Sequence, residues 1–157
     1  MNIAVKLIIS IAIPLAVGTS AGFFTATAVD NWYQTINKPS WNPPNWVFAP
    51  VWTMLYVMMG IALFLVWKSD ASDILKKTAF TLFAAQLILN FFWSFIFFNQ
   101  HQPGWALVEI IFMWIFILLT IFTFAQVSKT AGWLLVPYIS WVSFATILNY
   151  TIWQLNK

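Results

Sequence analysis

The stretch WALVEIIFMWIFILLTIFTFAQ, residues 105–126, decides the fold class of this chain. It holds one charged residue, Glu109, and is otherwise almost wholly apolar. About 20 such residues, each rising ~1.5 Å, cross the hydrocarbon core of a bilayer. A helix that is apolar on all sides has no face to turn toward water. The stretch therefore predicts a membrane-spanning helix.

Four more stretches of this kind occupy residues 3–29, 46–67, 79–98 and 131–153. Lipid offers no hydrogen bonds to the backbone, so each stretch must pair its own N–H and C=O groups as a helix. We predict an all-α integral membrane protein, in which residues 1–157 form a single transmembrane domain of five helices.

The composition agrees with a membrane protein and excludes several functions. Only 7% of the residues are charged, against roughly 25% in soluble domains. The lysines lie singly or in one pair between apolar runs, which argues against a basic nucleic-acid surface. The chain has no Cys and a single His. Thiolate sites and His clusters for a metal are therefore excluded, and we predict no metal, no cofactor and no nucleic-acid partner.

The short loops predict an orientation, because cytoplasmic loops carry an excess of lysine and arginine. Five spans place Lys38 and Lys157 on one side. The other side carries Lys6, Lys68, Lys76, Lys77 and Lys129. The amino terminus should therefore be cytoplasmic, with the first loop and the carboxyl terminus outside.

The first apolar stretch has a rival interpretation as a cleaved signal peptide. Its run over residues 7–24 is longer than the usual ~7–15-residue core of such a peptide, so we favour a retained helix. Gly18, Gly22 and Ala26 form a small-residue stripe along it. Such stripes let helices approach closely, and we favour packing within one molecule over a dimer seam.

Aromatic residues are the strongest anomaly, with 11 Trp and 16 Phe. Trp67, Trp105, Trp133 and Trp153 lie at span ends, where interfacial belts explain them. Deeper residues recur at helical spacing on single faces. These faces are Trp52 with Tyr56; Gln86, Asn90 and Trp93; and Trp141, Ala145, Leu148 and Asn149.

Amides at membrane depth must face protein or a cavity, because they are costly in lipid. One reading is hydrogen bonding between helices, worth ~0.6 kcal/mol on average. The other is an apolar, flat-walled ligand cavity with a few polar groups. Spacing alone does not separate them. Likewise the first loop, stiffened by three prolines around Trp41, fits a lid over the bundle or a structured connector.

No catalytic constellation is visible in the sequence. Glu109 is the only acid within a span and lies one turn after Trp105, so we expect it to reach the interface. His101 is a lone loop histidine, which we expect to be solvated. We therefore expect no conventional enzyme.

Four motifs, in order over nearly the whole chain, resemble the translocator protein / tryptophan-rich sensory protein family. They are KPSWNPP at 38–44 with APVW at 49–52; Gln86-Leu87 with Asn90 and Trp93; GWALVE at 104–109; and Pro137-Tyr138 with Trp141 and Leu148-Asn149-Tyr150. One departure concerns the sterol pattern of animal members, since the first Lys after Tyr150 is Lys157, beyond the proposed spacing. The short tail and tight loops resemble a bacterial member, in the cell membrane.

The resemblance implies a five-helix bundle, usually a homodimer, with the first loop as lid over a ligand cavity. It implies binding of porphyrins such as protoporphyrin IX, and of benzodiazepine-type drugs, in a receptor or sensor linked to tetrapyrrole and oxidative stress. The alternatives are light- or oxidant-dependent porphyrin degradation, which would involve Trp52 and Trp141, and transport of porphyrin or small molecules. The implied ligand-binding residues are Tyr33, Pro44, Ala49, Trp52, Gln86, Asn90, Trp93, Trp105, Trp141, Ala145, Leu148 and Asn149.

Overall fold

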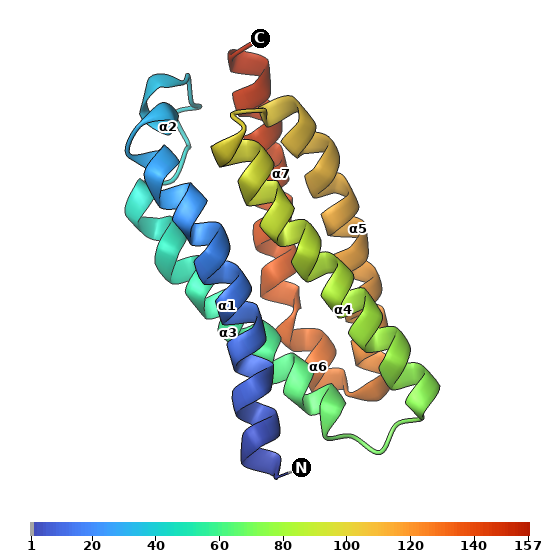
Figure 1. Cartoon of the computed structure of the whole chain (residues 1–157). Helices are drawn as coiled ribbons and strands as arrows, with labels where there is room; N and C mark the ends of the chain where they lie inside the picture. Colours follow the sequence, from blue (N-terminus) through green and yellow to red (C-terminus); the bar gives the residue numbers. More distant parts are fainter. Residues whose placement is uncertain (1) are drawn as a thin grey trace.

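A computed structural model describes residues 2–157 and shows a bundle of long helices (Figure 1). Five helical spans are long and apolar enough to cross a membrane, and residues 2–157 contain no strand. The chain is thus an integral membrane protein, and the predicted fold class is confirmed. The elements are α1 (Ile3–Val29), α2 (Trp32–Thr35), α3 (Asn45–Trp67), α4 (Asp73–Ser94), the π-helix η1 (Phe95–Asn99), α5 (Pro103–Val127), α6 (Lys129–Leu134) and α7 (Val136–Leu155).

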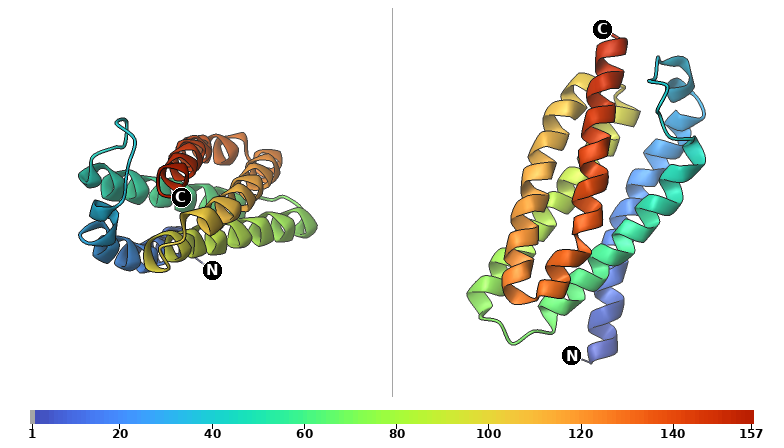
Figure 2. Two further views of the ribbon diagram at one scale, coloured as in Figure 1. Left: turned by 90° about the horizontal axis from the view of Figure 1, so that it is seen from above. Right: turned by 180° about the vertical axis from the view of Figure 1, so that it is seen from behind.

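The helices pack as two groups. Helix α1 lies along α3, and α5 packs against both α4 and α7, while α1 also contacts α4. The views in Figures 1 and 2 show the α1–α3 pair on one side of the bundle. The two termini lie at opposite ends (Figure 1), as an odd number of spans requires. Which end faces the cytoplasm stays a prediction.

The third span begins earlier than the sequence pattern indicated, at Asp73 instead of residue 79. Ser72 caps the helix, its Oγ accepting a hydrogen bond from the Leu75 N–H at 3.3 Å. Asp73 lies in the first turn, where a negative charge interacts favourably with the helix dipole. Apolar periodicity missed this start because Asp73, Lys76 and Lys77 interrupt its apolar residues.

The fifth span is not one continuous helix. It is divided at Leu135 into α6 and α7, whereas the sequence predicted a single helix over 131–153. Pro137 lies in the first turn of α7. A proline has no N–H, and its ring clashes with the carbonyl one turn earlier, so the helix restarts there.

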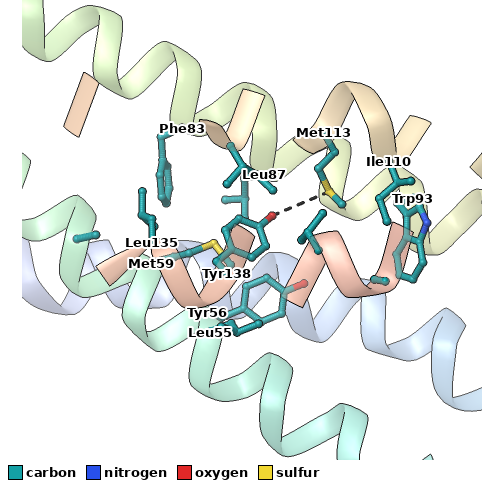
Figure 3. Packing of buried hydrophobic residues seen from close by; sticks show 14 of the residues in the cluster. Leu55, Tyr56, Met59, Phe83, Leu87, Trp93, Ile110, Met113, Leu135 and Tyr138 are labelled. Atoms are coloured by element: carbon teal, nitrogen blue, oxygen red, sulfur yellow. Dashed lines mark hydrogen bonds between the residues drawn. The ribbon is translucent and has the colours of Figure 1, made fainter. Parts of the chain in front are cut away.

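The core of the bundle is densely packed at mid-depth. Figure 3 shows Tyr138 and Tyr56 among the side chains of Met59 and Met113, and both methionines are fully buried. Nearby, α1 and α3 are in close contact at Gly60. A Cβ added there would lie 2.5 Å from the Ile11 Cα, so only glycine permits this approach.

Candidate ligand cavity

A cavity of about 420 Å³ lies at the first-loop end of the bundle, between α1, α3, the α4–η1 segment and α7. Its volume falls in the ~300–1,000 Å³ range of small-molecule sites. Eight of the residues implied by the resemblance lie on its wall. They are Tyr33, Ala49, Trp52, Trp93, Trp141, Ala145, Leu148 and Asn149.

Two of the wall tryptophans, Trp52 and Trp141, have an indole N–H that can donate a hydrogen bond to a ligand. Trp52 is stacked on Tyr56, with ring centroids 5.6 Å apart. On the facing helix, Trp141 packs against Phe144 at 5.5 Å and edge-on against Phe48 at 6.2 Å. Among residues 2–157, neither the Trp52 nor the Trp141 indole N–H has a hydrogen-bond partner. Both N–H groups are therefore free to bond to a ligand.

Trp93, in contrast, is held by the protein itself. Its indole N–H donates to the Asn149 Oδ1 at 3.0 Å, and the Asn149 Nδ2 donates to the Pro103 carbonyl at 2.7 Å. The Asn149 amide thus joins α4, α7 and the start of α5. It orients an aromatic wall residue and has little hydrogen-bonding capacity left for a ligand.

The Gln86 and Asn90 amides lie behind the wall, not on it. The Tyr56 hydroxyl donates to the Asn90 Oδ1 at 2.5 Å, and the Asn90 Nδ2 donates to the Tyr138 hydroxyl at 2.9 Å. The Tyr138 hydroxyl then donates to the Gln86 Oε1 at 2.8 Å. Both amides are only 1% exposed. These bonds join helices, so neither amide lines the cavity, although the resemblance implied both as ligand-binding residues. Tyr56 connects this network to the wall.

Pro44 and Trp105 also lie off the cavity wall. Pro44 is the residue that precedes α3, next to the wall residue Asn45. Trp105 is 69% exposed near the start of α5. This position at a span end fits the interfacial belt, as its place in the sequence indicated, whereas the resemblance implied a ligand-binding role.

Two wall residues that the sequence-based list omits come from the π-helix. Phe97 and Phe98 are adjacent in the chain, yet both are buried and line the cavity. The Gln100 N–H bonds to the Phe95 carbonyl at 3.0 Å, which is the i→i+5 pattern of a π turn. Phe97 and Phe98 follow Trp93 by four and five residues, so helical spacing could have placed them on the same side of the helix as Trp93. The π turn itself was not predictable.

The first loop is fixed from within by Tyr33. This side chain is 2% exposed, and its hydroxyl donates to the Asn42 Oδ1 at 2.8 Å. Burial raises the pKa of the Tyr33 phenol to about 12. The Lys38 ammonium donates to the Tyr33 carbonyl and, at 3.0 Å, to that of Ile36.

The same loop is fastened to two other parts of the bundle. The Asn37 N–H donates to the Asn156 Oδ1 at 2.9 Å, and the Asn156 Nδ2 donates back to the Asn37 carbonyl at 2.9 Å. Trp32 stacks on His101, with centroids 4.5 Å apart and planes 11° from parallel. The exposed His101 has a φ of 55°. The loop is therefore a well-anchored cover over the cavity end.

The environment of Glu109 differs from the prediction that this side chain reaches the interface. Both of its carboxylate oxygens are buried and lack a hydrogen-bond partner in the described chain, so they do not reach the interface. Glu109 is also not on the cavity wall. Within residues 2–157, no group of three or more His, Cys, Asp or Glu residues could hold a metal ion.

Comparisons with known proteins cover almost all of the sequence. A sequence model of the TspO/MBR family matches residues 10–154. The chain is 49% identical to "Tryptophan-rich protein TspO" of Chlorobaculum tepidum over 154 residues, covering 96% of this chain and 95% of that protein. It is 43% identical to the human "Translocator protein" over 126 residues, or 80% and 75% of the two chains. It is 40% identical to "Tryptophan-rich sensory protein" of Cereibacter sphaeroides over 127 residues, or 81% and 78%.

Proposed function

The chain belongs to the TspO/MBR family, and on that premise we propose that it is a membrane receptor or sensor that binds porphyrins, such as protoporphyrin IX, and other flat apolar ligands. The family membership supports the receptor or sensor role. The observation that carries the ligand class is the pair of wall tryptophans, Trp52 and Trp141, whose indole N–H groups have no partner among residues 2–157.

The walls suit a planar, apolar guest. Aromatic side chains come from α3, α4, η1 and α7, and few polar atoms interrupt them. Aromatic pairs contribute ~0.5–1.5 kcal/mol beyond the apolar area they bury. Because the side-chain amides already bond within the protein, we assign ligand orientation to the two free indole N–H groups. The anchored first loop covers that end of the cavity.

The test is a titration of the purified protein in lipid nanodiscs with protoporphyrin IX, followed in darkness by porphyrin absorbance. Replacing both Trp52 and Trp141 by Phe keeps apolar area but removes both N–H donors and part of each ring surface. At ~0.5–1.5 kcal/mol for each lost hydrogen bond, we expect the affinity to fall about 5- to 150-fold. Trp133→Phe is the matched control, since Trp133 is 73% exposed and off the wall.

Unchanged affinity and stoichiometry in the double variant would refute the assignment of the pocket. A parallel illuminated sample, analysed by mass spectrometry against free porphyrin, tests whether bound porphyrin is consumed. A product that forms only with the unmodified protein would add degradation to binding.

A further inference from the structure

The cavity has an opening on its side, between α1 and α3. Six of its lining residues are also exposed: Asn45 at the first-loop end of α3, and five small residues along the two helices. The five small residues are Thr19, Gly22 and Ala26 on α1, and Ala49 and Thr53 on α3. On each helix they are spaced by three or four residues, so each set forms a single edge. We call this opening the α1–α3 portal.

The contact between α1 and α3 is closed at mid-depth and open at the portal. A Cβ added at Gly18 would lie 2.2 Å from the Tyr56 ring, and one at Gly60 would lie 2.5 Å from the Ile11 Cα. One turn beyond Gly18, a Cβ added at Gly22 would meet no atom within 4 Å. The small-residue stripe on α1 thus packs tightly at one end and borders empty space at the other.

The rim of the portal is apolar in effect, although it contains threonines. The Thr19 hydroxyl donates to the Leu15 carbonyl at 2.8 Å, and the Thr53 hydroxyl donates to the Ala49 carbonyl at 2.8 Å. Hydroxyls bonded within their own helix do not need water. Since α1 and α3 are membrane spans, this rim faces lipid.

The first-loop end is covered by the anchored loop, and the exposed lining residue there, Asn45, is polar. Tyr33 is almost completely buried there, and the reciprocal bonds between Asn37 and Asn156 fasten the loop to the end of α7. A ligand arriving from water would have to break these contacts. A ligand dissolved in the bilayer would meet an apolar opening that leads to the wall tryptophans.

We propose that ligands reach the cavity sideways from the bilayer, through the α1–α3 portal. The ligands are then molecules that partition into the membrane first, and charged water-soluble compounds are poor ligands whatever their shape. The inference rests on the proposed function, because it names the route to the same cavity.

The route is tested without porphyrin, since the chain has no Cys. Ala145→Cys places one thiol on the cavity wall, where Ala145 is 9% exposed. In nanodiscs the thiol is labelled with N-phenylmaleimide, which dissolves in lipid, or with a membrane-impermeant sulfonated thiosulfonate. We expect the lipid-soluble reagent to label at least ~10-fold faster, relative to its rate with a small free thiol.

Adding Gly22→Leu fills the portal and should slow N-phenylmaleimide at least ~10-fold. Ala16→Leu is the control, because Ala16 is exposed on α1 and off the wall; it should leave the rate unchanged. Asn156→Ala, which loosens the loop, should also leave it unchanged. A rate that responds to Asn156→Ala and not to Gly22→Leu overturns the proposal, as does equally fast labelling by the impermeant reagent.

A thermal melt of each variant identifies any loss of fold. Should Gly22→Leu unfold the bundle, Thr53→Leu on the opposite rim repeats the test. Because labelling needs no porphyrin, a failed portal and a failed porphyrin site give different results. Portal-dependent labelling without porphyrin binding would overturn only the proposed ligand.

Discussion

Removing the Tyr138 hydroxyl should destabilise the bundle while leaving the cavity wall intact. In Tyr138→Phe the Asn90 Nδ2 loses its acceptor and the Gln86 Oε1 loses its donor, bonds of 2.9 and 2.8 Å. Among residues 2–157, the one other neighbour of this hydroxyl close to bonding distance is the Met113 Sδ at 4.0 Å (Figure 3), a weak partner. One amide atom on each of two side chains that are 1% exposed thus loses its partner, while the Asn90 Oδ1 keeps its bond from the Tyr56 hydroxyl.

The cost follows from what each orphaned group loses. A buried polar group without a partner costs ~1–3 kcal/mol, whereas interhelical bonds in membranes average ~0.6 kcal/mol because the unfolded chain also finds partners in lipid. We expect a total of about 1–3 kcal/mol. At ~2–4 °C per kcal/mol for a chain of this size, the melting temperature in detergent should fall by about 2–12 °C.

Tyr150→Phe is the matched control for this measurement. It makes the same chemical change on the same helix, but Tyr150 is 51% exposed and should shift stability by less than ~0.5 kcal/mol. Equal melting temperatures for the two variants would show that the buried network contributes nothing to stability. Porphyrin affinity should change little in Tyr138→Phe, because Tyr138 is off the cavity wall.

Three further predictions concern the helix contact and the loop. Gly60→Ala should cost ~1–3 kcal/mol of stability in a thermal melt by overpacking, because its Cβ would lie 2.5 Å from the Ile11 backbone. The control Gly22→Ala places its Cβ in open space, so it should be neutral or stabilising by up to ~1 kcal/mol. Equal costs for the two variants would contradict the packing described for Gly60. The pKa of Tyr33, raised to about 12 above the ordinary ~10, means that its burial stabilises the fold fully below pH ~10 and progressively less up to pH ~12. Tyr33→Phe should therefore flatten the loss of stability over that interval, and a parallel pH profile would contradict this. Asn156→Ala should speed hydrogen exchange at residues 36–42 about 2- to 10-fold, as expected for bonds worth ~0.5–1.5 kcal/mol, with the exchange of α4 as the unchanged reference.

The five spans were predictable because each is a long apolar run, and lipid permits few other structures. The inward faces were predictable where spacing marks them. Trp93 and Asn149 both turn inward, as their helical spacing indicated, although spacing did not distinguish a cavity wall from a contact between helices. Residues near polar helix starts were less predictable, as the capped start at Asp73 shows.

The partners of the amides were beyond sequence reasoning. Spacing shows that Gln86 and Asn90 share a face, but not that the Tyr138 and Tyr56 hydroxyls, from two other helices, meet them. Whether an inward amide faces a hollow or a neighbour depends on how far apart the helices stand. The portal depended on the same distances, since the pattern of Gly18 and Gly22 gives no sign that one is packed and the other open.

The π turn at Phe95–Asn99 also governs how substitutions in this segment should be interpreted. A π turn takes in one residue more than an α turn, so the side chains after Phe95 are rotated relative to a regular helical wheel drawn from α4. Deleting one residue within the turn would restore regular phase and swing Phe97 and Phe98 away from the hollow, toward acyl chains. A deletion here would therefore change the shape of the cavity more than any single substitution would. It would do so without altering any side chain on α1, α3 or α7.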